Sequence, residues 1–82
     1  MKIMKFLSEK EVERLRKKYP KGTVIECIQM NDIQGIPSGT LGTVTSVDDE
    51  GTIHMNWETG SSLGLIIGED KFQIKEKPKN NG

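Results

Sequence analysis

The sequence of 82 residues predicts a mainly β protein, a small five-stranded antiparallel barrel preceded by one α-helix. Residues 39–65 alternate apolar and polar side chains around two turns that end in glycine, which is typical of short, half-buried strands. A capping box precedes a short charged segment and indicates where a helix begins. Short, strongly bent strands in so short a chain favour a closed or half-closed barrel over a flat sheet.

The helix is expected to begin at Ser8 and end at Lys18. Ser8 stands three residues before Glu11, so each side chain can bond to the backbone N–H of the other residue. Val12 begins a narrow apolar stripe, and Pro20 prevents the helix from continuing. Because so short a helix is marginal alone in water, it is expected to pack on the strands.

The five strands are expected at Thr23–Met30, Gly42–Val47, Thr52–Trp57, Ser62–Ile67 and Phe72–Lys75. The first has apolar side chains on both faces, which predicts cover on both sides, with the helix covering the second face. The second needs a bulge near Thr45, because Val44 and Val47 cannot both point inward on a flat strand.

The length predicts one domain, with residues 1–21 as the helical unit, residues 22–75 as the barrel and residues 76–82 as a disordered polar tail. The single cysteine, Cys27, excludes an internal disulfide and fits a reducing, cytoplasmic setting. It is interpreted as a small buried hydrophobe. No targeting or membrane-spanning segment is recognised.

Charge is balanced over the chain but unevenly placed. Residues 1–21 carry a net +5, residues 22–72 a net −7 and residues 73–82 a net +2. The helix and the barrel are therefore expected to attract each other. A barrel that binds nucleic acid should carry positive charge on its strands, so nucleic-acid binding is disfavoured.

No motif for catalysis, a metal or a cofactor stands out. His54 and Cys27 are too few ligands for zinc, and the acidic segment 48–50 lacks the ligand spacing of a calcium loop. The glycines occur singly at turns and do not form a phosphate-binding loop. We therefore expect a non-enzymatic protein with no cofactor.

The candidate partner-binding residues are Ile33, Ile36, Pro37 and Trp57. The first three lie on the longest loop, residues 31–38, and Trp57 ends a strand beside a turn. Apolar side chains on a loop indicate a groove for a partner. The alternative interpretation is that Trp57 caps the core and Ile36 folds beneath it.

The spacing of glycines and apolar residues forms a recognisable pattern: Pro20-x-Gly22-Thr23, Met30-x-Asp32, Pro37-x-Gly39-x-x-Gly42-x-Val44, Val47-Asp48-Asp49-x-Gly51-x-Ile53, Trp57-x-x-Gly60-Ser61 and Gly68-x-Asp70-x-Phe72. It resembles the family Domain of Unknown Function four-three-one-four, found in bacteria, phages and conjugative elements. The resemblance covers about Tyr19 to Phe72 and implies an SH3-like barrel without implying an activity. Ile33 stands where a proline is frequent, and Glu58 where Asp is frequent.

A second, partial resemblance is to the SH3-like repeat of Mind-bomb ubiquitin ligases. The segments Gly39-x-x-Gly42-Thr43-Val44 and Trp57-x-x-Gly60-Ser61 carry it. Those repeats bind peptides of partner proteins, which implies the same kind of ligand here. Ile66-Ile67 stand where that repeat has a Tyr-Arg pair.

Two function classes remain open after the sequence. The first is a protein-binding module of phage or mobile-element origin, with an unidentified protein partner and no membrane contact. The alternative is a nucleic-acid-binding accessory protein that uses the basic helix. A structural subunit of a larger assembly is a third class, and the oligomeric state is left open.

Overall fold

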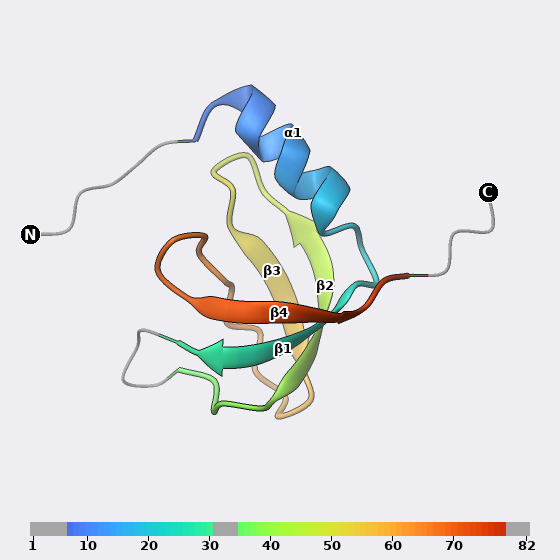
Figure 1. Cartoon of the computed structure of the whole chain (residues 1–82), viewed down its shortest axis with the longest axis vertical. Helices are drawn as coiled ribbons and strands as arrows, with labels where there is room; N and C mark the ends of the chain where they lie inside the picture. The colour runs from blue at the N-terminus through green and yellow to red at the C-terminus, as the bar shows by residue number, and fades with distance from the viewer. Residues whose placement is uncertain (1–6, 31–34, 79–82) are drawn as a thin grey trace, which may run out of the picture.

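The computed structural model describes residues 7–30 and 35–78. These residues form one helix, α1 (Glu9–Lys18), and the strands β1 (Val24–Gln29), β2 (Leu41–Val47), β3 (Ile53–Trp57) and β4 (Lys71–Glu76). The strands make one antiparallel sheet in the order β3-β2-β1-β4. Figure 1 shows α1 lying at the end of the sheet where β2 turns into β3. The mainly β class with an N-terminal helix is confirmed.

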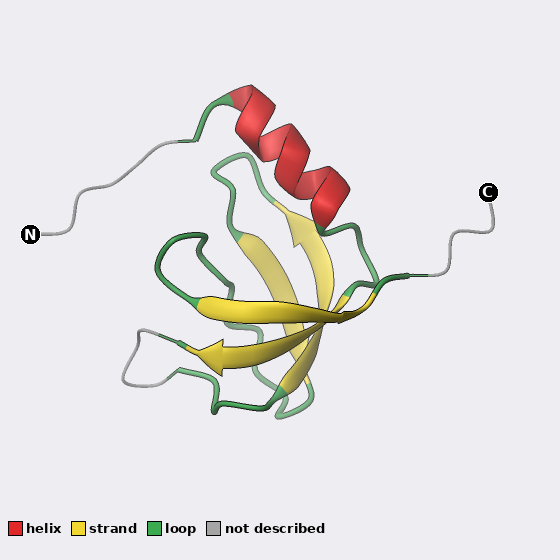
Figure 2. Cartoon of the chain, in the orientation of Figure 1, coloured by secondary structure: helices red, strands yellow, loops and turns green. Residues whose placement is uncertain are grey.

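The prediction of a five-stranded barrel is wrong, because residues 62–67 do not form a strand. Leu65 pairs with Ile53 in an isolated bridge, with N···O distances of 3.0 and 2.9 Å. The carbonyl of Leu63 instead accepts a hydrogen bond of 2.7 Å from Trp57 Nε1. Since a side chain occupies that carbonyl, the ladder beside β3 stops at the Leu65 bridge and the sheet stays open (Figure 2).

The helix begins as predicted. Ser8 N–H donates to Glu11 Oε1 at 3.0 Å, and Glu11 N–H donates to Ser8 Oγ at 3.2 Å, which completes the capping box. Val12 is buried, and the side chains of Leu7 and Leu15 lie over Gly51 in the turn between β2 and β3. The helix is therefore held by apolar contact with that turn and with β2.

Strand β1 is covered on one face, and the prediction of cover on both faces is wrong. Ile25 and Cys27 point inward and have no exposed surface, whereas Ile28 on the opposite face is 42% exposed. The helix was expected to cover the face of Ile25 and Cys27, but it packs on β2 and the following turn rather than on β1. The outer face of the sheet is open at Ile28.

The irregularity expected in β2 is confirmed. The pairing of β2 with β3 shifts register between Val44 and Ser46. Thr45 has no opposite residue in β3 and is therefore the extra residue of a bulge. The bulge brings Val44 and Val47 to the same buried side, which regular alternation would not allow.

The core lies between the sheet, α1 and the segment after β3. Its buried apolar side chains are Val12, Tyr19, Ile25, Cys27, Ile36, Val44, Val47, Ile53, Met55, Trp57 and Leu65. The region predicted as a disordered tail begins inside β4, which extends to Glu76, and residues 79–82 lie outside the described residues. Within the described residues, no helix is long and apolar enough to cross a membrane.

Replacing Gly42 with Ala should destabilise the fold. A Cβ at this position would collide with the indole of Trp57, and the buried ring has no room to move away. The expected cost is about 1–3 kcal/mol in the free energy of unfolding, measured by urea denaturation. Thr43→Ala, at the exposed neighbouring position, is the control and should change stability by less than about 0.5 kcal/mol. Equal stability of the two variants would contradict the tight Gly42–Trp57 contact.

Candidate functional site

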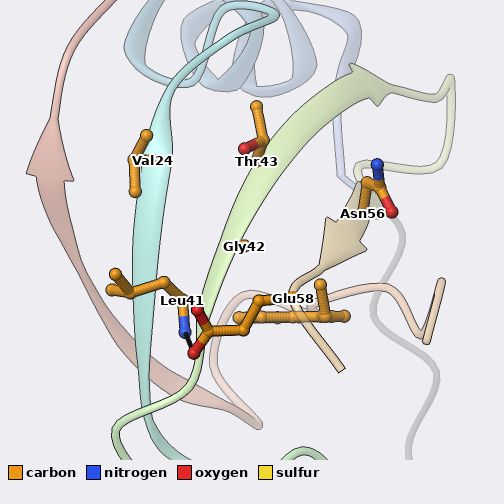
Figure 3. Close-up of a pocket in the computed structure, with 7 residues that line it drawn as sticks. Val24, Leu41, Gly42, Thr43, Asn56 and Glu58 are labelled. Carbon is orange, nitrogen blue, oxygen red and sulfur yellow. Dashed lines mark hydrogen bonds between the residues drawn. The ribbon is translucent and has the colours of Figure 1, made fainter. Parts of the chain in front are cut away.

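A groove with a volume of about 300 Å³ lies on the outer face of the sheet, where β1, β2 and β3 run side by side (Figure 3). Val24, Leu41, Gly42, Thr43, Asn56, Trp57 and Glu58 line it. Alternation along the strands explains Val24, Thr43 and Asn56, because their neighbours Ile25, Val44 and Met55 point into the core. Gly42 and Trp57 belong to the inward face and form the floor of the groove, because Gly42 has no side chain to cover the Trp57 ring.

The register of the sheet aligns the groove residues across three strands. Thr43 stands opposite Val24 on one side and opposite Asn56 on the other. Directly opposed residues in antiparallel strands lie close enough for their side chains to interact with a common ligand. The three side chains therefore form one row across the sheet.

Glu58 forms one end of the groove. Its Oε1 accepts a hydrogen bond of 3.1 Å from the N–H of Leu41, and its own N–H donates to the carbonyl of Leu41 at 2.9 Å (Figure 3). These two bonds tie the turn after β3 to the first residue of β2. They also hold a carboxylate beside the exposed Leu41 side chain, which is 36% exposed.

The groove offers hydrogen-bonding groups, apolar surface and one carboxylate. Thr43 supplies a hydroxyl, Asn56 an amide, and Val24 and Leu41 apolar surface. Among the described residues, no three His, Cys, Asp or Glu side chains are close enough to hold a metal ion. This set of groups is suited to binding a ligand by contact and hydrogen bonding.

The predicted partner-binding residues fall in different places. Trp57 lines the groove but is only 2% exposed, and Ile36 is 6% exposed and packs in the core. This burial agrees with the alternative interpretation that both are core residues. Pro37 is exposed, and Ile33 lies outside the described residues. The structure therefore brings Trp57 to the groove without Ile36.

The surroundings of Ile36 explain its burial. Its carbonyl accepts from Cys27 Sγ at 3.4 Å, and its N–H donates to Met30 Sδ at 3.3 Å. Burial raises the pKa of the Cys27 thiol, and the nearby charge of Asp70 raises it further. Cys27 is thus a protonated, buried side chain, as the sequence predicted, and it also helps to fix the loop before β2.

Sequence reasoning missed Val24, Leu41, Thr43 and Asn56 as groove residues. The sequence did contain an indication of this surface. Leu41 is a large apolar residue, and alternation with the buried Gly42 and Val44 places it on the outward side of β2. The pairing of β1 with β2, which brings Val24 opposite Thr43, could not be read from local sequence.

A second polar cluster lies at the turn between β2 and β3. Asp48 Oδ1 accepts from the N–H groups of Glu50 and Thr52 at 2.9 and 3.0 Å, and Asp48 Oδ2 lies 2.8 Å from His54 Nε2. His54 is half-buried beside this carboxylate. The cluster closes the turn and is separate from the groove.

These bonds set the protonation of Asp48. Burial acts to raise the pKa of its carboxyl, but the hydrogen bonds from His54, Thr52 and Glu50 outweigh it and lower the pKa below 3.8. The folded state therefore holds the carboxylate more strongly than the unfolded state does. Its contribution to stability is complete above pH 3.8 and is lost as the pH falls through the lower folded-state pKa.

Asp48→Asn should lower the melting temperature at neutral pH and should have less effect as the pH falls. The variant removes the charge that the turn stabilises, and protonation removes the same charge from the wild type in acid. Thermal unfolding of both proteins from about pH 7 to about pH 2 measures the difference. Glu50→Gln, at the exposed end of the turn, is the control. A difference that stays constant with pH would contradict this role of Asp48.

The described residues form a small mainly β protein with an open antiparallel sheet, one N-terminal helix and a groove on the outer face. The chain belongs to the family described as Domain of unknown function (DUF4314), whose model matches residues 8–75. This confirms the resemblance seen in the sequence. No curated protein and no solved structure matches the chain significantly.

Proposed function

We propose that this protein is a protein-binding module whose partner docks on the outer face of the sheet, over the groove. The observation that carries the proposal is the uncovered apolar surface on that face. Leu41 and Ile28 are both exposed there, and they are diagonal neighbours because Glu26 stands opposite Leu41. An apolar surface beside a groove favours contact with another protein.

The arrangement of strands supports a particular kind of module. The order β3-β2-β1-β4, with Leu65 bridged to Ile53, supports the proposal of an SH3-like arrangement whose seam is open. The resemblance to peptide-binding SH3-like repeats supports a peptide or protein ligand. The free thiol of Cys27 fits a partner in the cytoplasm, and the family's occurrence in phages and conjugative elements favours host or mobile-element machinery.

The nucleic-acid alternative depends on α1 alone. Lys10, Arg14 and Lys17 are exposed on the side of the helix away from Val12. In contrast, the lysines of the sheet lie on β4, where Lys75 pairs with Glu26, and β1, β2 and β3 offer no positive charge to phosphates. We therefore favour protein binding.

We expect no tight binding to duplex DNA at physiological salt. Residues 22–72 carry a net −7, and this part of the molecule repels the phosphate backbone. Fluorescence anisotropy should give a dissociation constant no tighter than about 1 µM. A tighter complex that weakens steeply with salt and is lost on Lys10→Gln/Arg14→Gln substitution would favour the nucleic-acid alternative.

Filling the groove should abolish partner capture without unfolding the protein. Thr43→Arg places a long side chain in the groove at an exposed position, so the core is unaffected. Ser46→Arg is the control, since Ser46 is exposed on the same strand and does not line the groove. Proteins captured from nuclease-treated host lysate are compared by mass spectrometry. At least one protein should be reduced about tenfold or more with Thr43→Arg and retained with Ser46→Arg. Capture that is equal for the two variants would contradict the proposed surface.

A further inference from the structure

The further inference concerns the chemistry of the groove's ligand and rests on the proposed protein-binding function. We propose that the groove binds an extended, basic segment of another protein. A Lys or Arg of that segment pairs with Glu58, and a neighbouring apolar side chain packs on Leu41.

The charge of the surface selects a basic ligand. Among the described residues, Glu58 is the one charged residue that lines the groove. The strands β1, β2 and β3 that form it contain no Lys or Arg, since none occurs between Lys21 and Lys71. The lysines of the sheet lie on β4, which does not line the groove, and Lys75 pairs with Glu26. The carboxylate of Glu58 therefore attracts positively charged segments and repels negatively charged ones.

Glu58 has acceptor capacity left for such a ligand. Among the described residues, its side chain makes one hydrogen bond, from the N–H of Leu41 to Oε1. A carboxylate offers about four acceptor positions on its two oxygens. Glu26, which lies on the same face, is already occupied by Gln73 at 2.7 Å and Lys75 at 3.7 Å. Glu58 is therefore the carboxylate that a ligand can pair with.

The shape of the groove fits an extended chain. Its volume of about 300 Å³ is at the lower end of the roughly 300–1,000 Å³ typical of small-molecule pockets, so it has room for a few side chains rather than for a cofactor. The Thr43 hydroxyl and the Asn56 amide face the groove (Figure 3). An extended segment presents backbone N–H and C=O groups that these side chains can bond.

A library of random linear peptides tests the ligand chemistry directly. It is selected on the wild type and on Thr43→Arg. Peptides retained by the wild type and lost on Thr43→Arg are expected to be enriched in Lys and Arg next to an apolar residue. No selected peptides, selection without basic residues, or equal selection on Thr43→Arg would overturn the inference.

The role of Glu58 is tested with one selected peptide. Glu58→Gln keeps an oxygen for the N–H of Leu41 and removes the charge, so the turn should stay folded. It should weaken binding about twofold to fivefold, the range of an exposed ion pair, and added salt should reduce this difference. Glu50→Gln makes the same change at the opposite end of the β2–β3 hairpin and should bind as the wild type does. Equal affinities of the two variants would overturn the pairing with Glu58.

The outcomes separate this inference from the proposed function. If Thr43→Arg abolishes capture of a cellular partner and Glu58→Gln binds as tightly as the wild type, the groove is a binding site and the basic-ligand inference is wrong. If sedimentation shows self-association that Glu58→Gln and Thr43→Arg both dissociate, the occupant is a second copy of this chain, and the inference is also wrong.

Discussion

The packing of the Trp57 indole against Gly42 is the contact on which the rest of the sheet depends. Any side chain at Gly42 would occupy the space of the ring, so glycine lets β2 and the largest core residue meet closely. The chain has only four aromatic residues, and so few large side chains leave little else to fill the interior. The same pair also lines the groove, so core packing and the candidate binding surface share one element.

The Trp57 side chain also explains why the sheet does not close. Leu63, Leu65 and Ile67 alternate as a strand should, and local sequence gave no reason to reject one. In the structure the indole N–H takes the Leu63 carbonyl, and Asp70 Oδ2 accepts from the N–H of Ile66 at 2.9 Å. Both are bonds between a side chain and the backbone that compete with a β ladder. Such competition depends on residues brought together by folding, so periodicity alone could not reveal it.

Features decided within a few residues were predictable, and features decided by packing were not. The capping box at Ser8 and the bulge between Val44 and Ser46 follow from local spacing and were predicted correctly. The position of α1 was not, because it depends on contacts with residues far away in the sequence. Leu7 and Leu15 pack at Gly51, and Arg16 Nε donates to the Val47 carbonyl at 3.1 Å. The groove likewise arises from the pairing of β1 with β2 and could not be derived from either strand alone.

The opposite net charges of the helix and of residues 22–72 hold the helix to the sheet less than the sequence suggested. Opposite net charges on the helix and on the strands suggested that the two attract each other. In the structure Arg16 pairs with Asp49 at 2.7 Å, but the Asp49 side chain is 98% exposed, so solvent screens the pair and it adds little to stability. The apolar contacts of Leu7 and Leu15 with the turn at Gly51 are the stronger link between helix and sheet. Because α1 packs on β2 and the β2–β3 turn, where Arg16 reaches Val47 and Asp49, it lies at the opposite end of the hairpin from Glu58. The carboxylate of Glu58 therefore stays available to a partner.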